Sequence, residues 1–223
     1  GLFGLDDGVW TVSVTSSDDA GNVSDPGEPL SVTVDTQAPS QPAAPSLDTA
    51  SDTGRSASDR ITADTTPSLS VASELDATVA LAASGPSGTS ANASAISSTT
   101  LTSITMPTLA DGEWSLSATV TDRAGNASSA SAATVVTVDT QAPTAATPDL
   151  RASADTGRSN SDNLTNRSGT AGSTLVFDIA KSESDSHVTV SIDGATICTD
   201  TSASGTSYAC TRAAATALDD GAH

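Results

Sequence analysis

Val-Thr-Val-Asp-Thr-Gln-Ala-Pro occupies residues 32–39 and returns unchanged at residues 136–143, 104 residues further along the chain. The alternation of Val and Thr before the aspartate is the period-two pattern of a β-strand with one buried face. Pro39, which ends the first copy, and Pro42 and Pro45, which follow it, stiffen the chain and cannot continue a sheet ladder. The segment therefore predicts a last strand that runs into a linker, with domain boundaries near residues 38 and 142.

Three other motifs repeat in the same order. A Leu-x-Asp-Gly motif occupies residues 5–8, 109–112 and 218–221, an Asp-x-Ala-Gly-Asn motif residues 18–22 and 122–126, and an Asp-Thr-Gly-Arg-Ser motif residues 52–56 and 155–159. A period of about a hundred residues indicates a tandem array of domains. We predict the C-terminal part of one repeat at residues 1–38, a complete repeat at 39–142 and the N-terminal part of a divergent repeat at 143–223. The chain is thus expected to be a fragment of a longer array.

Within the repeats, apolar residues alternate with small or polar ones over short runs, as in strands that bury one face. No window has an apolar stripe at helical spacing. Roughly seven short strands in about 100 residues predict an all-β chain of tandem immunoglobulin-like β-sandwiches with truncated terminal domains. Trp10 and Trp114 are expected to anchor the cores. The alternating residues are Leu69 and Val71, Val79 and Leu81, Trp114, Leu116, Ala118 and Val120, a returning strand near 133–138, Leu175, Phe177 and Ile179, and Val188, Val190 and Ile192.

The composition excludes several classes of function. The chain has 27 acidic and 8 basic residues, a net charge of −19 and a pI near 4.1. Such a charge repels nucleic acid and anionic membranes. No run of apolar residues is long enough to span a bilayer, and no N-terminal stretch has the pattern of a signal peptide. Aspartate greatly exceeds glutamate, and Ser and Thr are abundant, which favours turns, loops and strands over helices.

Taken together and in order, these motifs and Thr65-Thr66-Pro67 resemble the bacterial Ig-like repeats of giant RTX-type and biofilm-associated adhesins. The resemblance covers nearly the whole chain, although the third repeat departs from it in the middle and carries two cysteines. It implies a cell-surface stalk of tandem Ig-like modules, exported by Gram-negative bacteria through type I secretion and often stiffened by calcium between modules. The implied partners are neighbouring repeats, with host or surface ligands bound by other domains.

Calcium binding is also expected from the topology. In an Ig-like sandwich the end of the last strand, the loop after the first strand and the Asp-Gly turn lie at one pole, and the final hairpin loop of the next domain faces that pole. Calcium takes about six to eight oxygen ligands, so carboxylates from both sides can share one site. The alternative is that these aspartates only build Asx turns and tight turns. The predicted metal ligands are Asp35, Asp52, Asp59, Asp111, Asp122, Asp139, Asp155 and Asp162.

Cys198 and Cys210 are the only cysteines and are twelve residues apart. Either they form a disulfide that spans a hairpin, or they remain two unpaired thiols. Neither has a nearby pair of histidines for metal ligation. The disulfide is the prediction, because it suits an oxidising extracellular compartment.

Catalytic residues are not expected. His187 and His223 have neither a nucleophile in a recognised elbow nor a partner at zinc-ligand spacing. Paired carboxylates recur in each repeat, whereas catalysis usually occupies one unique site. Two functions remain: a structural extender that holds a distal binding domain away from the cell, and a ligand-binding Ig-like module that contacts carbohydrate or a host protein. For the second function, Tyr208 is the candidate exposed aromatic contact.

Overall fold

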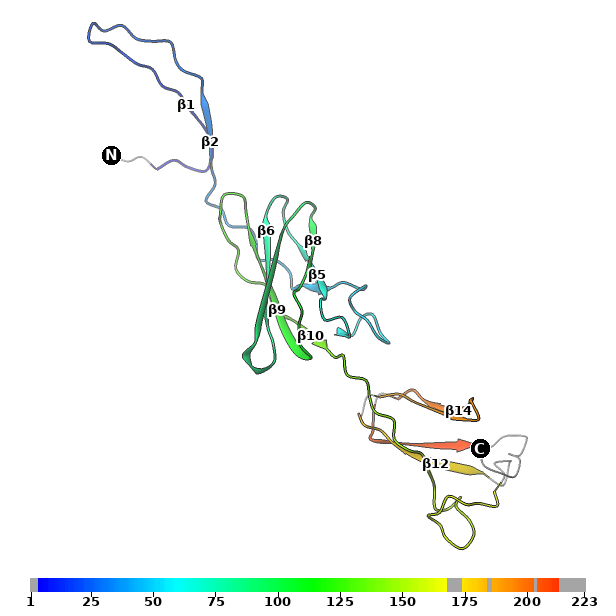
Figure 1. The fold of residues 1–223 in the computed structure, drawn as a ribbon. Coiled ribbons are helices and arrows are strands. Elements are labelled where there is room, and N and C mark those ends of the chain that lie inside the picture. Colours follow the sequence, from blue (N-terminus) through cyan, green and yellow to red (C-terminus); the bar gives the residue numbers. More distant parts are fainter. Residues whose placement is uncertain (1–3, 168–173, 184–185, 203, 213–223) are drawn as a thin grey trace. The chain divides into compact units, whose positions relative to one another are not determined.

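A computed structural model of the protein describes residues 4–167, 174–183, 186–202 and 204–212. The chain divides into two compact units, Gly1–Thr140 and Gln141–His223 (Figure 1). The third Leu-x-Asp-Gly motif, at residues 218–221, and His223 lie outside the described residues. In the part of the chain that the structure describes, no helix is long and apolar enough to cross a membrane.

The first unit begins with an antiparallel hairpin of β1 (Gly8–Val12) and β2 (Leu30–Val34). Trp10 lies opposite Val32, in the same register as Trp114 opposite Val136 in the complete repeat. Trp10 is 38% exposed, because the hairpin forms a two-stranded sheet that no other described strand joins. The prediction that Trp10 anchors a core is therefore wrong for the described chain.

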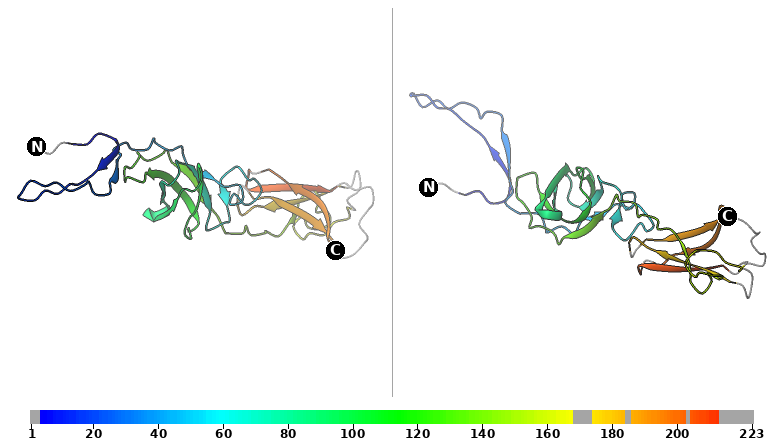
Figure 2. Two further views of the ribbon diagram at one scale, coloured as in Figure 1. Left: turned by 90° about the horizontal axis from the view of Figure 1, so that it is seen from above. Right: turned by 60° about the horizontal axis from the view of Figure 1, so that its bottom comes forward.

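The complete repeat consists of two β-sheets, coloured cyan to green in Figures 1 and 2. One has the strand order β4-β10-β9-β6-β7 and the other β3-β5-β8. β4 pairs in parallel with β10, and the remaining pairs in both sheets are antiparallel. A 3-10 turn, Pro86–Gly88, joins β6 to β7. The strands are β3 (Ser46–Leu47), β4 (Ile61–Thr62), β5 (Ser68–Ala72), β6 (Thr78–Ser84), β7 (Ser90–Ile96), β8 (Leu101–Thr105), β9 (Gly112–Thr121) and β10 (Thr134–Val138).

The core of this repeat is formed by the alternating apolar residues of both sheets. Leu69 on β5, Leu81 on β6 and Trp114 on β9 are all buried, so the strands expected from the period-two pattern are confirmed. The pattern missed β7, because its half-buried face carries only alanines and its Ile96 is exposed. It also missed β8, where a buried threonine takes the place of one of the apolar residues.

The second unit repeats this pairing. The sheet β11-β12-β15 corresponds to β3-β5-β8, and the pair β13-β14 corresponds to β6-β7. Leu175, Ile179 and Val190 are buried, as their alternation predicted. The prediction of an all-β chain of immunoglobulin-like sandwiches is confirmed. The strands are β11 (Asp149–Leu150), β12 (Leu175–Ala180), β13 (Val188–Ile192), β14 (Ala195–Asp200) and β15 (Ser207–Arg212).

Candidate metal-binding loops

The Asp52 loop, residues 51–64, connects β3 to β5 and contains the short strand β4. Asp52 is 6% exposed, and its Oδ2 accepts a hydrogen bond from the Arg60 backbone N–H at 3.3 Å. Arg60 has a φ of +64°, a left-handed conformation that costs a non-glycine residue about 1–2 kcal/mol. The Thr62 hydroxyl donates to the Ser51 carbonyl and closes the loop. The fold thus holds the Asp52 side chain in a fixed, buried position.

The Asp155 loop, residues 154–167, repeats this geometry in the second unit. Asp155 is 3% exposed, and its Oδ2 accepts a hydrogen bond from the Asn163 backbone N–H at 3.1 Å. Asn163 has a φ of +58°, and the Thr165 hydroxyl donates to the Ala154 carbonyl at 2.6 Å. The left-handed residue is Arg in one loop and Asn in the other, so no residue type common to both loops marks this position. Each of the two loops therefore holds its own buried aspartate by the same set of hydrogen bonds.

The second carboxylate oxygen of each buried aspartate has no partner within the described part of the chain. Oδ1 of Asp52 and Oδ1 of Asp155 are buried and accept no hydrogen bond from the described residues. Burying an oxygen in this way is unfavourable, and more so when the carboxyl is ionised. Calcium binds such hard oxygen ligands. Each loop therefore holds one buried carboxylate oxygen of the kind that calcium accepts, in equivalent positions.

Asp59 and Asp162 lie in the same two loops but are exposed. Asp59 Oδ1 accepts a hydrogen bond from the Ile61 backbone N–H at 3.1 Å, and Asp162 Oδ1 accepts one from the Leu164 N–H at 3.2 Å. These are the local bonds of Asx turns. The turn-building alternative therefore accounts for Oδ1 of each residue, which accepts the turn hydrogen bond. It does not account for Oδ2, which takes no part in that bond.

The structure brings Asp111 and Asp139 to the same end of the complete repeat as the Asp52 loop. Asp111 Oδ1 accepts hydrogen bonds from the backbone N–H and the hydroxyl of Thr140, at 3.2 and 3.0 Å. The Asp139 N–H donates to the Thr62 carbonyl at 2.9 Å. The equivalent Asp35 accepts a hydrogen bond from the Gln37 N–H at 3.0 Å. The shared pole expected from the topology is thus present.

Asp122 lies in the turn between β9 and β10, where protein donors occupy both of its oxygens. Oδ1 accepts hydrogen bonds from the backbone N–H groups of Gly125 and Asn126, at 2.7 and 2.8 Å. Oδ2 accepts one from Asn126 Nδ2 at 2.9 Å. The Asn126 side chain, followed by these backbone donors, lowers the pKa of Asp122 below its ordinary value. Its carboxylate is therefore stabilised in the ionised form by the turn itself.

Among the described residues, no group of three or more His, Cys, Asp or Glu side chains lies close enough together to hold a metal ion. Asp52, Asp59, Asp111 and Asp139 lie at one end of the complete repeat without forming such a cluster, and Asp122 lies at the opposite end of β9. A cation at the Asp52 loop would thus take most of its oxygens from carbonyls, hydroxyls and water, all of which calcium accepts.

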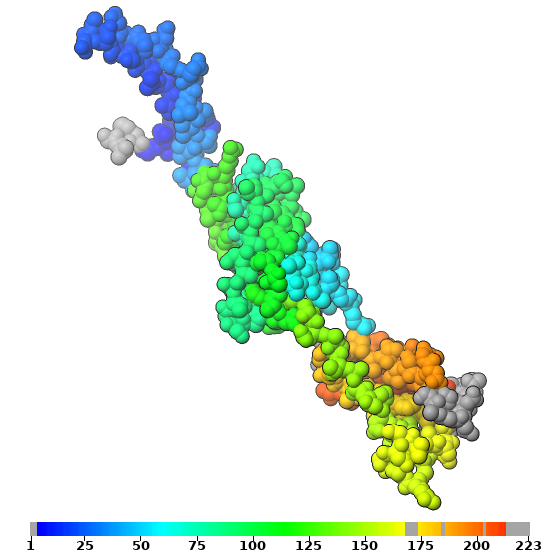
Figure 3. Space-filling view, in the orientation of Figure 1, coloured from blue at the N-terminus to red at the C-terminus, as the bar shows by residue number. Residues whose placement is uncertain are grey.

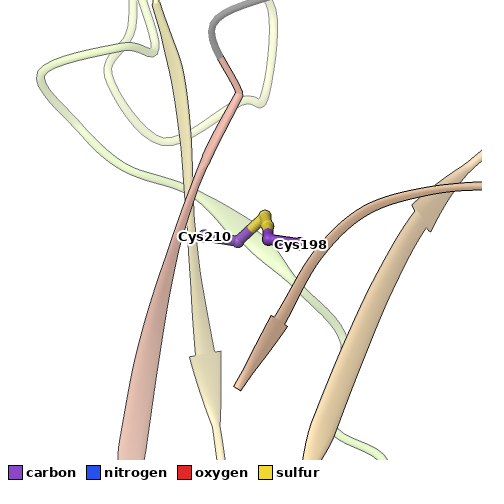
Figure 4. The surroundings of a disulfide bond; sticks show 2 residues. All are labelled: Cys198 and Cys210. Atoms are coloured by element: carbon purple, nitrogen blue, oxygen red, sulfur yellow. A yellow bond between two sulfur atoms is a disulfide. The ribbon is translucent and has the colours of Figure 1, made fainter. Parts of the chain in front are cut away.

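Cys198 and Cys210 form a disulfide with a Cα–Cα distance of 6.0 Å (Figure 4). The expectation that it spans a hairpin is wrong, because Cys198 lies on β14, whose partner is β13, whereas Cys210 lies on β15, whose partner is β12. The bond therefore links the two sheets of the second unit. Cys210 is fully buried beside Ile179 and Val190.

Tyr208 is not the exposed contact that the sequence suggested. It is partly buried and packs against the cluster of Ile179, Val190 and Cys210.

A buried ion pair in the second unit had no signal in the sequence: Lys181 Nζ lies 3.1 Å from Asp200 Oδ2, and the Lys181 side chain has no exposed surface. The ion pair and the packing of Tyr208 both stabilise the core of the second unit.

The fold and the duplicated loops define a tandem array of immunoglobulin-like modules. Residues 38–140 match the model of the bacterial Ig-like domain family. A solved tetra-tandem repeat from the extending region of a large adhesion protein is similar, with 20% sequence identity and a TM-score of 0.37 over 93% of this chain and 48% of that chain. The chain therefore spans about half the length of that structure. Comparison with curated proteins gives no match.

Proposed function

We propose that the chain is an extender segment in the stalk of a bacterial cell-surface adhesin and has no catalytic activity. The observation that carries the proposal is repetition. The hairpin register around Trp10 recurs around Trp114, and the Asp52 loop recurs as the Asp155 loop. Catalysis needs one unique site, whereas an extended array needs many copies of a self-contained module that contacts its neighbours. Its partners are then the adjacent Ig-like repeats, and neither nucleic acid nor a membrane.

The extracellular location is part of the same proposal. The disulfide between Cys198 and Cys210 suits an oxidising compartment. The net charge of −19 keeps a long array soluble and apart from anionic surfaces. Secretion by an RTX-type route and a role in biofilms are consistent with the resemblance of the motifs to those adhesins.

Calcium is the cation proposed to rigidify the stalk, bound at the Asp52 and Asp155 loops near the ends of the modules. The support is the buried, unpartnered Oδ1 in each loop, together with the placement of Asp111 and Asp139 at the same end as the Asp52 loop. A divalent cation there would reduce the repulsion among carboxylates in a strongly acidic chain. Its chemical contribution would be to bind oxygen ligands from loops that are otherwise joined only by hydrogen bonds.

The substitution Asp52→Asn tests calcium binding through an effect of opposite sign in two buffers. In chelator the variant is expected to melt at the same temperature as the native chain or higher, because a buried carboxylate with one unpartnered oxygen is replaced by a neutral amide. In saturating calcium it is expected to melt lower than the native chain, because a ligand is lost. Thermal melting by circular dichroism and the stoichiometry from isothermal titration calorimetry measure both effects.

Asp48→Asn is the matched control for this experiment. Asp48 accepts hydrogen bonds from the hydroxyls of Ser70 and Ser103, at 2.6 and 2.5 Å, so both of its oxygens have partners. Its substitution should shift the melting temperature equally with calcium and with chelator. No heat of calcium binding to the native chain, or an equal shift for Asp52→Asn in both buffers, would exclude the calcium site.

The alternative function, a module that binds carbohydrate or a host protein, gains less support. A cavity of about 380 Å³ in the second unit is lined by Ile179, Lys181 and His187, among others, and its lining by described residues includes no Phe, Tyr or Trp. Carbohydrate sites usually present exposed aromatic faces. With Tyr208 packed on the core, binding of carbohydrate to this unit would need a different kind of contact.

A further inference from the structure

The Asp122 turn, residues 122–126, fixes the orientation of the Asn126 side chain. A side-chain amide has two N–H donors in one plane, so two acceptors define its position. One N–H of Asn126 donates to Asp122 Oδ2 at 2.9 Å, and the other donates to the backbone carbonyl of Asp35 at 3.0 Å. Asp35 is the residue after β2, so this bond joins the strand end of the first hairpin to the complete repeat.

The linker that follows Asp35 also lies against the complete repeat. Gln41 Nε2 donates to the Ala130 carbonyl at 2.6 Å, and the Thr134 hydroxyl donates to the Pro45 carbonyl. Ala130 and Asn126 belong to the connection between β9 and β10, and Thr134 is the first residue of β10. All three contacts are therefore made with one continuous segment of the complete repeat. Figure 3 shows the blue linker touching this green segment. The linker is thus bonded at three points along its length.

Proline packing adds to these hydrogen bonds. Pro42 and Pro45 are buried, and Pro39 is half-buried. A polyproline II segment has three residues per turn, so prolines spaced by three lie on one face. Pro39 and Pro42 line a shallow depression together with Val120 of β9. Since a proline-rich segment is already stiff, little entropy is lost when that face packs against the domain.

A second turn in the chain shows that the Asp-x-Ala-Gly-Asn motif folds without the linker contact. In the first hairpin, Asp18 Oδ1 accepts hydrogen bonds from the backbone N–H groups of Ala20 and Asn22, both at 2.9 Å. Asp18 Oδ2 accepts one from Asn22 Nδ2 at 2.8 Å. The turn is therefore complete by itself, and the second N–H of Asn126 serves the contact with Asp35.

We propose that the Asp122 turn is a docking surface for the strand end of the preceding repeat, and that Asn126 and the proline face hold this junction without a metal ion. The partner that this surface fits is an Asp-Thr-Gln-Ala-Pro segment. The surface binds the backbone carbonyl of the aspartate, which is Asp35 in this chain. Asp122 acts as a positioning residue that orients Asn126. The inference rests on the extender function proposed above and assigns part of its stiffness to direct contacts, whereas the calcium proposal concerns the Asp52 and Asp155 loops.

Spin-label distances across the junction test this inference. Labels are attached to the full chain at Thr33→Cys and Ser115→Cys, two exposed strand positions, with the native disulfide kept oxidised. The distribution of label distances is expected to be narrow and equal in calcium and in chelator. Asn126→Ala is expected to broaden it at least about twofold in both buffers. Asn22→Ala, at the matched turn, is expected to leave it unchanged.

Gln41→Ala is the second variant, because it removes a linker contact without touching the turn; it should also broaden the distribution. The junction proposal is overturned if neither Asn126→Ala nor Gln41→Ala broadens the distribution. It is equally overturned if chelator alone broadens that of the native labelled chain, since the junction would then depend on a metal ion. Failure of the extender proposal would look different. The distribution between the labels at positions 33 and 115 would stay narrow, while the complete chain remained flexible in calcium.

Discussion

Trp114→Ala is expected to lower the free energy of unfolding of the complete repeat by about 3–5 kcal/mol. The Trp114 ring is 3% exposed and packs over Gly85, where a Cβ atom would lie 2.6 Å from the ring. Its Nε1 donates to the Ala110 carbonyl at 2.8 Å. The substitution leaves a large cavity between the sheets and one carbonyl without its donor. Urea unfolding followed by far-UV circular dichroism measures the loss.

Trp10→Ala is the matched control, because Trp10 has the same register and the same kind of hydrogen bond. Its Nε1 donates to the Asp6 carbonyl at 2.9 Å, but the ring is 38% exposed. We expect this variant to lose less than about 1 kcal/mol. Equal losses of unfolding free energy for the two variants would contradict the claim that Trp114 stabilises the repeat by packing between the sheets.

Lys181→Met is expected to destabilise the second unit by about 3–5 kcal/mol, because removing one partner of a buried ion pair leaves the other charge without compensation. Lys181 Nζ donates to Asp200 Oδ2 and to the Ser202 carbonyl, each at 3.1 Å. Asp200 would remain buried with only the donors of Ser202. Hydrogen exchange of the amides of β12 and β15 measures the loss in this unit.

Arg151→Met is the control for the ion pair. Arg151 Nη2 lies 2.5 Å from Asp178 Oδ1, but both side chains are almost half exposed. Exposed pairs contribute at most about 1 kcal/mol. A loss for Lys181→Met as small as that for Arg151→Met would contradict the importance of the buried pair.

The same pair has a signature in pH. Hydrogen bonds from Ser202 and then from Lys181 lower the pKa of Asp200 to about 2. Because the pKa is lower in the folded state, the stabilisation is present above the ordinary value of 3.8 and is lost as the pH falls toward 2. The second unit should therefore lose stability in this window. The double variant Lys181→Met/Asp200→Leu should lose less over the same range.

The strands could be predicted from the sequence because their apolar residues face one core. Leu69 and Leu116 alternate with serines and Leu81 with alanines, and the side-chain period of a strand is two. Strand β7 has only alanines on its half-buried face, so pattern alone did not reveal it. Trp10 shows a different limit: its motif matches that of Trp114, but no other described strand joins its hairpin, so its ring stays partly exposed.

The candidate site could be predicted only in part. Repetition identified Asp52 and Asp155, and the structure places both in equivalent buried positions. It did not distinguish them from Asp122, because all three recur within motifs. The difference is in the partners: Asp122 has backbone and amide donors on both oxygens, whereas Oδ1 of Asp52 has none. Such partners depend on where the backbone N–H groups point, which residue identity alone does not specify.

The central claim, a stalk segment stiffened by calcium, is tested most directly by small-angle X-ray scattering of the full chain in saturating calcium and in chelator. We expect a longer, better-defined particle in calcium, and a smaller radius of gyration with the scattering of a flexible chain in chelator. The double variant Asp52→Asn/Asp155→Asn should resemble the chelated chain in both buffers. Scattering profiles of the native chain that superimpose in the two buffers would contradict the claim.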